Sequence, residues 1–174
     1  MKSLRKTCIS TVMIGAFVLA AGTSYATSSI IYDGGTGWSQ GHSSGSAIVV
    51  PGSTSCGFDG KMRWTQGESA YSDESVWGKW SNQNVPVWAD SSFQYQVYIP
   101  NCNSNASVKY GVVYGTSSQK IAVDQARYSD EWVNLGTYFI PKDKNGPASF
   151  ITLDTWRTGT SYKIGWDEAA FYTH

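Results

Sequence analysis

The sequence predicts an all-β protein, built as an antiparallel β-sandwich or jelly roll. At least seven short segments alternate apolar and polar residues, and turn-forming residues separate them at regular intervals. No window has the periodicity of an amphipathic helix. Aromatic residues make up 14% of the chain, charged residues only 15%, and there are 18 glycines. This composition is typical of strands and turns, and the even spacing of the segments favours two packed antiparallel sheets.

The clearest strands lie in the middle of the chain. "FQYQVYIP" (93–100) alternates aromatic and aliphatic residues, from Phe93 to Ile99, with glutamines and a tyrosine. "SVKYGVVYG" (107–115) and "QKIAVDQ" (119–125) repeat the alternation. Each segment is therefore expected to bury one face.

Three further segments continue this series toward the C-terminus. They are "TYFIP" (137–141), "ASFITLD" (148–154) and "SYKIGWDEAAFY" (161–172), separated by the turn-rich stretches "KDKNGP" and "RTGTS". Trp132 and Trp166 are expected in the core or at its edge.

The N-terminal third is less regular. Residues 33–47 form a glycine- and serine-rich stretch around Trp38. Residues 72–90 bring Trp77, Trp80 and Trp88 together with little periodicity. We expect both stretches to be long loops at one end of the sandwich.

Residues 1–26 are interpreted as an export signal, and residues 27–174 as a single β-sandwich domain. A basic start precedes a 15-residue apolar run, and small residues at Ser24 and Ala26 suit a signal peptidase. That run is too short to span a membrane. Removal of the signal leaves 10 basic and 13 acidic side chains, a net charge of −3. We therefore expect a secreted or periplasmic protein that binds no nucleic acid and does not insert into membranes.

Cysteine usage agrees with export. Cys8 lies in the signal, which leaves Cys56 and Cys102 in the domain. In an exported chain two cysteines are typical of a disulfide rather than of a metal site, and two free buried thiols are the alternative.

Few residues are suited to catalysis. His42 and His174 are the two histidines of the sequence, and no G-x-S-x-G elbow accompanies them. Adjacent acids occur at 73–74, 130–131 and 167–168, but neighbours on a strand point to opposite faces. We therefore predict no catalytic residues and no enzyme. The alternative is a small polysaccharide-degrading enzyme, which would need two carboxylates from distant segments in one cleft.

Asp167 differs from the other acids because apolar segments flank it on both sides. It is interpreted as a hydrogen-bonded strand residue. The alternative is a ligand of a structural calcium ion, since calcium binds hard carboxylate oxygens. No other metal and no cofactor is predicted.

Aromatic residues in polar, turn-like surroundings are the candidate binding residues. An indole face offers flat apolar area and a polar N–H, which suits stacking on the C–H face of a sugar. A neighbouring arginine supplies hydrogen bonds to hydroxyl or carboxylate groups. The predicted carbohydrate-binding residues are Trp38, Trp77, Trp88, Trp156, Tyr128 and Arg157. The alternative is that these side chains only anchor long loops.

A set of scaffold positions between residues 93 and 172 resembles the golvesin C-terminal-like domain, also described as the carbohydrate-binding-like domain of xanthan lyase. The matching positions are "YQVYIP" (95–100), "VKYGV" (108–112), "VDQ" (123–125), Trp132, Leu135-Gly136, Tyr138, Phe139 and "WDEAAF" (166–171). Residues 30–92 match more loosely. The resemblance implies a galactose-binding-like β-sandwich and a carbohydrate ligand.

The leading hypothesis is therefore a secreted, non-catalytic domain that recognises a glycan or polysaccharide through exposed aromatic residues. A secreted protein-interaction module on the same fold, such as an inhibitor or adhesion partner of a secreted or surface protein, is the second. The polysaccharide-degrading enzyme is the third.

Overall fold

The computed structural model describes residues 28–42, 56–68, 76–86, 89–143, 148–155 and 158–174. The predicted export signal, residues 1–26, lies outside these described residues. Within them the structure consists of strands and one short 3-10 helix. The elements are β1 (Ser29–Ile31), β2 (Trp38–His42), β3 (Arg63–Gln66), β4 (Val76–Ser81), β5 (Ser91–Ile99), β6 (Ser107–Tyr114), β7 (Ser117–Asp124), η1 (Gln125–Arg127), β8 (Glu131–Ile140), β9 (Ser149–Asp154), β10 (Lys163–Trp166) and β11 (Ala169–Thr173).

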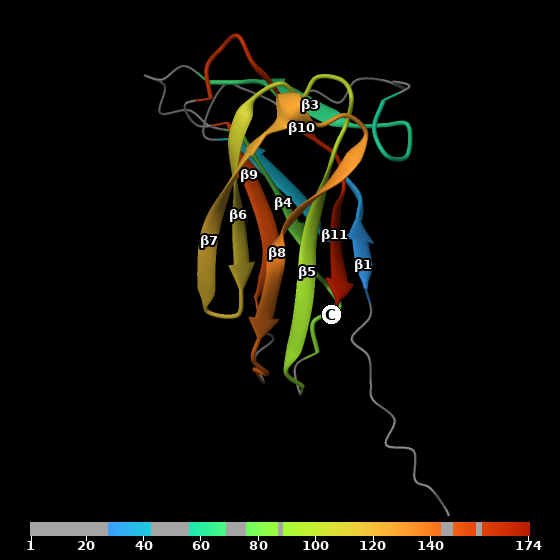
Figure 1. Ribbon diagram of the computed structural model, residues 1–174, viewed down its shortest axis with the longest axis vertical. Helices are drawn as coiled ribbons and strands as arrows, with labels where there is room; N and C mark the ends of the chain where they lie inside the picture. Colours follow the sequence, from blue (N-terminus) through green and yellow to red (C-terminus); the bar gives the residue numbers. More distant parts are fainter. Residues whose placement is uncertain (1–27, 43–55, 69–75, 87–88, 144–147, 156–157) are drawn as a thin grey trace, which may run out of the picture.

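Two antiparallel sheets form a sandwich (Figure 1). One has the order β1-β11-β5-β8 and the other the order β2-β4-β9-β6-β7. A two-stranded ribbon of β3 and β10 crosses one end of the sandwich, above both sheets in Figure 1. The predicted all-β, antiparallel sandwich is confirmed.

The core lies between the two sheets and follows the alternation of the sequence. Every second residue of β5, from Phe93 to Ile99, is buried, as are Ile151 and Leu153 of β9. Trp166, expected in or near the core, is fully buried. Alternation places one face of each strand inside, so the core forms from positions that are two residues apart.

Tyr95 joins the two sheets with a polar contact inside this core. Its hydroxyl lies 2.6 Å from Ser149 Oγ of β9 and donates to the carbonyl of Val113 on β6 at 3.2 Å. Burial raises the pKa of Tyr95 to about 12. The phenol is therefore held neutral, as a buried donor, at physiological pH.

The two stretches expected to be loops each contain a strand. Residues 33–47 include β2, and residues 72–90 include β4. The buried positions of β4 are Val76, Gly78 and Trp80, so its inward face mixes the smallest and the largest residue types. Because one of the inward positions is a glycine, the alternation of apolar and polar residues that predicts a strand is not evident in this segment.

The segment 161–172, expected to continue as one strand, is broken into two. β10 pairs with β3 in the ribbon, whereas β11 pairs with β1 and β5 in the four-stranded sheet. Asp167 and Glu168 form the connection at which the chain leaves one sheet and enters the other. Both residues are buried there.

The predicted disulfide between Cys56 and Cys102 is present, with Cα atoms 6.4 Å apart. It joins the segment before β3 to the loop that follows β5. In the described residues, no helix has the length and apolar character needed to cross a membrane.

Candidate functional site

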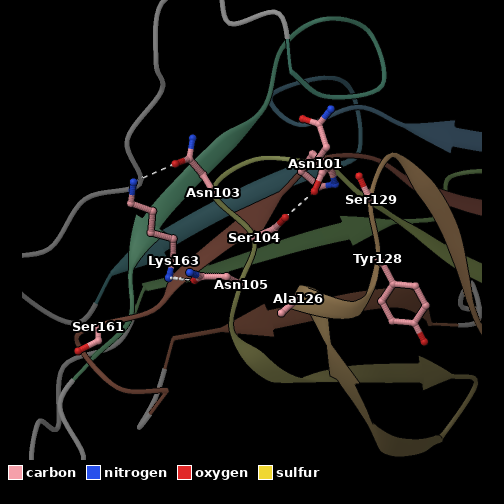
Figure 2. Close-up of a pocket in the computed structure, with 10 residues that line it drawn as sticks. Asn101, Asn103, Ser104, Asn105, Ala126, Tyr128, Ser129, Ser161 and Lys163 are labelled. Carbon is pink, nitrogen blue, oxygen red and sulfur yellow. Dashed lines mark hydrogen bonds between the residues drawn. The ribbon is translucent and has the colours of Figure 1, made fainter.

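A polar pocket opens at the end of the sandwich that carries the β3–β10 ribbon. Its volume is about 510 Å³, within the range of small-molecule sites. Three segments line it: the loop after β5, the turn that contains η1, and the approach to β10 (Figure 2). The lining residues are Pro100, Asn101, Asn103, Ser104, Asn105, Ala126, Tyr128, Ser129, Ser161 and Lys163.

Local hydrogen bonds hold the asparagine-rich loop in shape. Ser104 Oγ donates to the carbonyl of Pro100 at 2.5 Å, and Asn103 has a φ of 51°. Asparagine is among the few residue types that adopt this left-handed conformation readily. Asn101 donates to both carboxylate oxygens of Asp130, from its backbone N–H and from its side-chain amide. Together with the Cys102 disulfide, these contacts fix the loop before any ligand binds.

Lys163 connects this loop to the ribbon. Its Nζ donates to Asn103 Oδ1 at 3.0 Å and lies 4.7 Å from the ring centroid of Trp64. Its backbone N–H donates to Asn105 Oδ1 at 2.7 Å, and its carbonyl accepts from the backbone N–H of Asn105. The ammonium group is thereby placed on the pocket wall, where it can donate to a ligand oxygen.

A buried glutamine supports the pocket from below. The amide of Gln125 donates to the hydroxyl of Tyr110 at 2.9 Å and to the carbonyl of Gly165 at 3.1 Å. Its Oε1 accepts from the backbone N–H of Gly165 at 3.3 Å. Gln125 is fully buried, so it joins the turn carrying Ala126 and Tyr128 to the strand carrying Lys163.

The pocket lining also contains hydroxyl groups that make no hydrogen bond within the described residues. Within the described part of the chain, the side-chain oxygens of Tyr128, Ser129 and Ser161 have no protein hydrogen-bond partner. Ser161 lies at one side of the pocket, and Tyr128 and Ser129 at the other (Figure 2). The hydroxyl, amide and ammonium groups of the lining can donate to and accept from a polyhydroxylated ligand. The ring of Tyr128 lies at one edge of the pocket (Figure 2).

Of the predicted binding residues, Tyr128 lines this pocket; its half-buried side chain also packs against the core. Trp77 lies elsewhere: it is 39% exposed on the outer face of the five-stranded sheet, beside Asp154 of β9. Its indole lies over Gly41, where an added Cβ would come within 2.6 Å of the ring. Trp77 is therefore a flat, exposed aromatic surface separate from the pocket.

Trp38 lies on the opposite side of the same sheet from Trp77. It pairs with Trp80, their ring centroids are 4.9 Å apart, and it packs against the core. This packing agrees with the alternative that Trp38 anchors its segment to the core. Trp88, Trp156 and Arg157 lie outside the described residues.

Sequence reasoning missed Asn101, Asn103, Asn105 and Lys163. The signal that could have found the asparagines is "NCNSN" (101–105), which places an amide at every second position directly after a strand. Lys163 carries no such local signal, because its hydrogen bonds with Asn103 and Asn105 join segments that are far apart in the sequence.

Three acidic residues come together outside the pocket and could hold a metal ion. Asp33 follows β1, and Asp167 and Glu168 connect β10 to β11; their ligand oxygens lie within 4.8 Å of one another. Asp167 Oδ2 accepts from the backbone N–H of Phe58 at 3.0 Å, which agrees with the hydrogen-bonded role predicted for it. The residue lies between two strands rather than within one.

Comparison with known proteins supports the fold. No family model and no curated protein sequence matches the chain. Among solved structures, the chain is similar to part of a xanthan lyase from Paenibacillus, with a TM-score of 0.62 and 17% identity. The match covers 86% of this chain and 13% of the lyase.

Two further structures match at lower TM-scores. The enzymatically active domain of tailspike protein 4 from bacteriophage CBA120 has a TM-score of 0.42 and 7% identity, over 79% of this chain and 18% of that one. A family 11 carbohydrate-binding module from Clostridium thermocellum, in complex with a mixed-linked tetrasaccharide, has a TM-score of 0.39 and 12% identity, over 82% and 94%. The chain thus has the fold of a small portion of the xanthan lyase that it matches.

Proposed function

We propose that this protein is a non-catalytic, exported carbohydrate-binding domain, and that the polar pocket at the end of the sandwich is its glycan site. The observation that carries the proposal is the lining of that pocket. It combines asparagine amides, one ammonium group, the ring of Tyr128 and three hydroxyls that have no hydrogen-bond partner among the described residues.

Sugar recognition suits this combination of groups. Each sugar hydroxyl both donates and accepts hydrogen bonds, so a binding site needs donors and acceptors in close proximity. Asn101, Asn103 and Asn105 lie on one loop held by Ser104, Asp130 and the disulfide. Because these groups are already ordered, binding loses less conformational entropy than it would with a mobile loop.

Other observations agree with the proposal without carrying it. The scaffold is shared with part of a xanthan lyase, in line with the resemblance of residues 93–172 to golvesin C-terminal-like domains. The disulfide is consistent with an oxidising, extracytoplasmic compartment. Asp33, Asp167 and Glu168, the three acids that come together outside the pocket, are not part of its lining, so we assign them no role in cleavage of a bound glycan.

A glycan array with the purified protein tests the function, followed by calorimetric titration with the best glycan. The double variant Ser129→Ala/Ser161→Ala removes two hydroxyls that have no protein partner in the described residues, so it should fold normally. Loss of two ligand hydrogen bonds, at about 1 kcal/mol each, should weaken binding at least tenfold. No glycan on the array, or unchanged affinity in this variant, would contradict the pocket assignment.

The matched control is Ser117→Ala/Ser118→Ala. Both serines are exposed at the start of β7, at the far end of the sandwich from the pocket (Figure 1). This variant should bind like the wild type. Trp77→Ala tests the alternative that the exposed face of the five-stranded sheet is the glycan site, because Trp77 is not part of the pocket lining. Loss of binding in this variant alone would place the glycan site on that sheet face.

An aromatic cluster on the four-stranded sheet favours the second candidate function, a protein-interaction module. Phe58, Tyr98 and Trp132 pack edge to face with centroids 5.2 to 5.4 Å apart, and Phe58 is 43% exposed. Aromatic side chains are enriched at protein interfaces. Capture of one stoichiometric partner from an exported protein fraction, lost in Phe58→Ala and insensitive to added sugars, would support this function instead.

A further inference from the structure

Strand pairing brings Asp33 to the connection between β10 and β11. β1 pairs with β11 so that Ile31 lies opposite Ala169. The chain beyond Ile31 therefore runs alongside the residues that precede Ala169. The ligand oxygens of Asp33, Asp167 and Glu168 consequently lie within 4.8 Å of one another, and we call these three residues the acidic cluster.

The acidic cluster contains buried oxygens without protein partners. Glu168 is 0% and Asp167 1% exposed. When both acids are ionised, the two carboxylate oxygens of Glu168 and Oδ1 of Asp167 have no hydrogen-bond donor among the described residues. Protonation of Glu168 allows one hydrogen bond between the two carboxyl groups. Buried polar groups without partners are costly, and buried carboxylates especially so. A group that binds these oxygens would remove that cost.

Basic side chains of the protein neutralise only part of the negative charge of the acidic cluster. Arg63 Nε lies 3.1 Å from Asp33 Oδ2, and this ion pair leaves the other two acids without a direct basic partner among the described residues. The charge of Asp59 makes the potential at all three acids more negative, and Asp130 does the same at Asp167. Lys61 reduces the negative potential at Asp33. The electrostatic balance of the site therefore favours an added cation.

Burial and mutual repulsion also act on the acids themselves. Burial raises the pKa of Asp167 and of Glu168, and the hydrogen bond with Asp167, together with its charge, raises the pKa of Glu168 further. A bound cation acts in the opposite direction, because it favours the ionised form of each carboxylate.

We propose that Asp33, Asp167 and Glu168 bind one calcium ion. Calcium takes oxygen ligands at about 2.3–2.6 Å, so one ion can join oxygens up to roughly 5 Å apart. Magnesium binds at about 2.0–2.1 Å and demands an octahedral shell, which suits a wider spread of carboxylates less well. The partial exposure of Asp33 leaves a side on which water completes the coordination.

The position of the ion indicates what it does. It connects the loop after β1 to the β10–β11 connection, and through Asp167 to the backbone of Phe58. Gly57, with a φ of 99°, turns the chain so that the Phe58 N–H faces Asp167. The ion would therefore hold together the N-terminal strand, the C-terminal strand and the disulfide-bearing loop.

Calcium-dependent stability of the purified, chelator-treated protein tests the proposal. Calcium at 100 times its dissociation constant should raise the melting temperature by about 5–10 °C, magnesium at the same concentration by less. Calorimetry should find one equivalent of calcium. Absence of both a calcium-induced shift and a calcium binding signal at millimolar concentration would overturn the proposal, and would mean that protons and Arg63 alone neutralise the site.

Terbium luminescence provides a second, local readout. Trp80 Nε1 donates to the carbonyl of Asp167 at 2.9 Å, so an indole lies beside the site. Terbium, a calcium substitute with the same preference for oxygen, should show tryptophan-sensitised emission that calcium removes by competition. Emission that calcium does not displace would contradict a shared site.

Two variants locate the ion. Glu168→Gln and Asp33→Asn each remove one ligand charge and should weaken calcium binding at least tenfold, with Asp33→Asn serving if Glu168→Gln fails to fold. The matched control is Glu131→Gln, an exposed glutamate on β8, which should keep the full calcium response. An unchanged calcium response in both cluster variants would overturn the assignment.

Discussion

Replacement of Gln125 by leucine should destabilise the protein and disturb the pocket. Gln125 is fully buried, and its side chain makes three hydrogen bonds, to the Tyr110 hydroxyl and to the N–H and carbonyl of Gly165. Leucine has a similar volume but satisfies none of these groups. Each buried group left unsatisfied costs about 1–3 kcal/mol, and local relaxation recovers part of the total.

We therefore expect Gln125→Leu to lower the free energy of unfolding by about 3 kcal/mol. For a domain of this size, that corresponds to a decrease in melting temperature of about 6–12 °C. Urea unfolding followed by tryptophan fluorescence measures the first quantity, and calorimetry the second. Gln96→Leu is the matched control, because Gln96 is half-buried on the outer face of β5.

A loss below about 1 kcal/mol in Gln125→Leu, or equal losses in the two glutamine variants, would refute this reasoning. Such a result would mean that the polar contacts of Gln125 do not hold the turn with Tyr128 to the ribbon. Weaker glycan binding by Gln125→Leu, measured below its melting temperature, is the expected functional consequence.

Other predictions concern the disulfide, the buried tyrosines and Trp38. Cys56→Ser/Cys102→Ser should lower the free energy of unfolding by about 4 kcal/mol on the chain-entropy model, measured by urea unfolding; a loss below about 1 kcal/mol would count against that model here. Burial raises the pKa of Tyr95 to about 12 and that of Tyr110 above its ordinary range, so their contribution to stability is complete below pH 10 and decreases as the pH rises toward 12. Ultraviolet titration should show these two phenols ionising after the exposed tyrosines, and their ionisation near pH 10 in the folded protein would contradict their burial. Trp38→Ala should lower the melting temperature because Trp38 packs against Trp80, whereas an unchanged melting temperature would indicate a free binding surface instead.

The sequence predicts the sandwich well because its strands alternate over long stretches. From Phe93 to Ile99, inward and outward residues follow one another without interruption, and burial follows the same order. β4 could not be predicted in this way, because Gly78 and Trp80 occupy successive inward positions. The glycine leaves space for the ring of Trp38 from the neighbouring strand, and this compensation between strands is invisible in a single segment.

The candidate site was less accessible to prediction, since it depends on contacts between distant segments. Tyr128 was predicted from its aromatic ring, but its companions Asn103 and Lys163 are 60 residues apart and meet through the ribbon. The acidic cluster was hidden for a different reason. Asp167 and Glu168 were expected on one strand with opposite orientations, whereas they connect two strands and both turn inward beside Asp33.

Mapping the glycan contact by amide chemical shifts tests the central claim most directly. The protein is titrated with the best glycan from the array, and the backbone amide signals are followed by nuclear magnetic resonance. The account predicts shifts concentrated in residues 100–105, 126–129 and 161–163, which line the pocket. Shifts concentrated around Trp77 on β4 and its neighbours on β9, with the pocket signals unchanged, would contradict it.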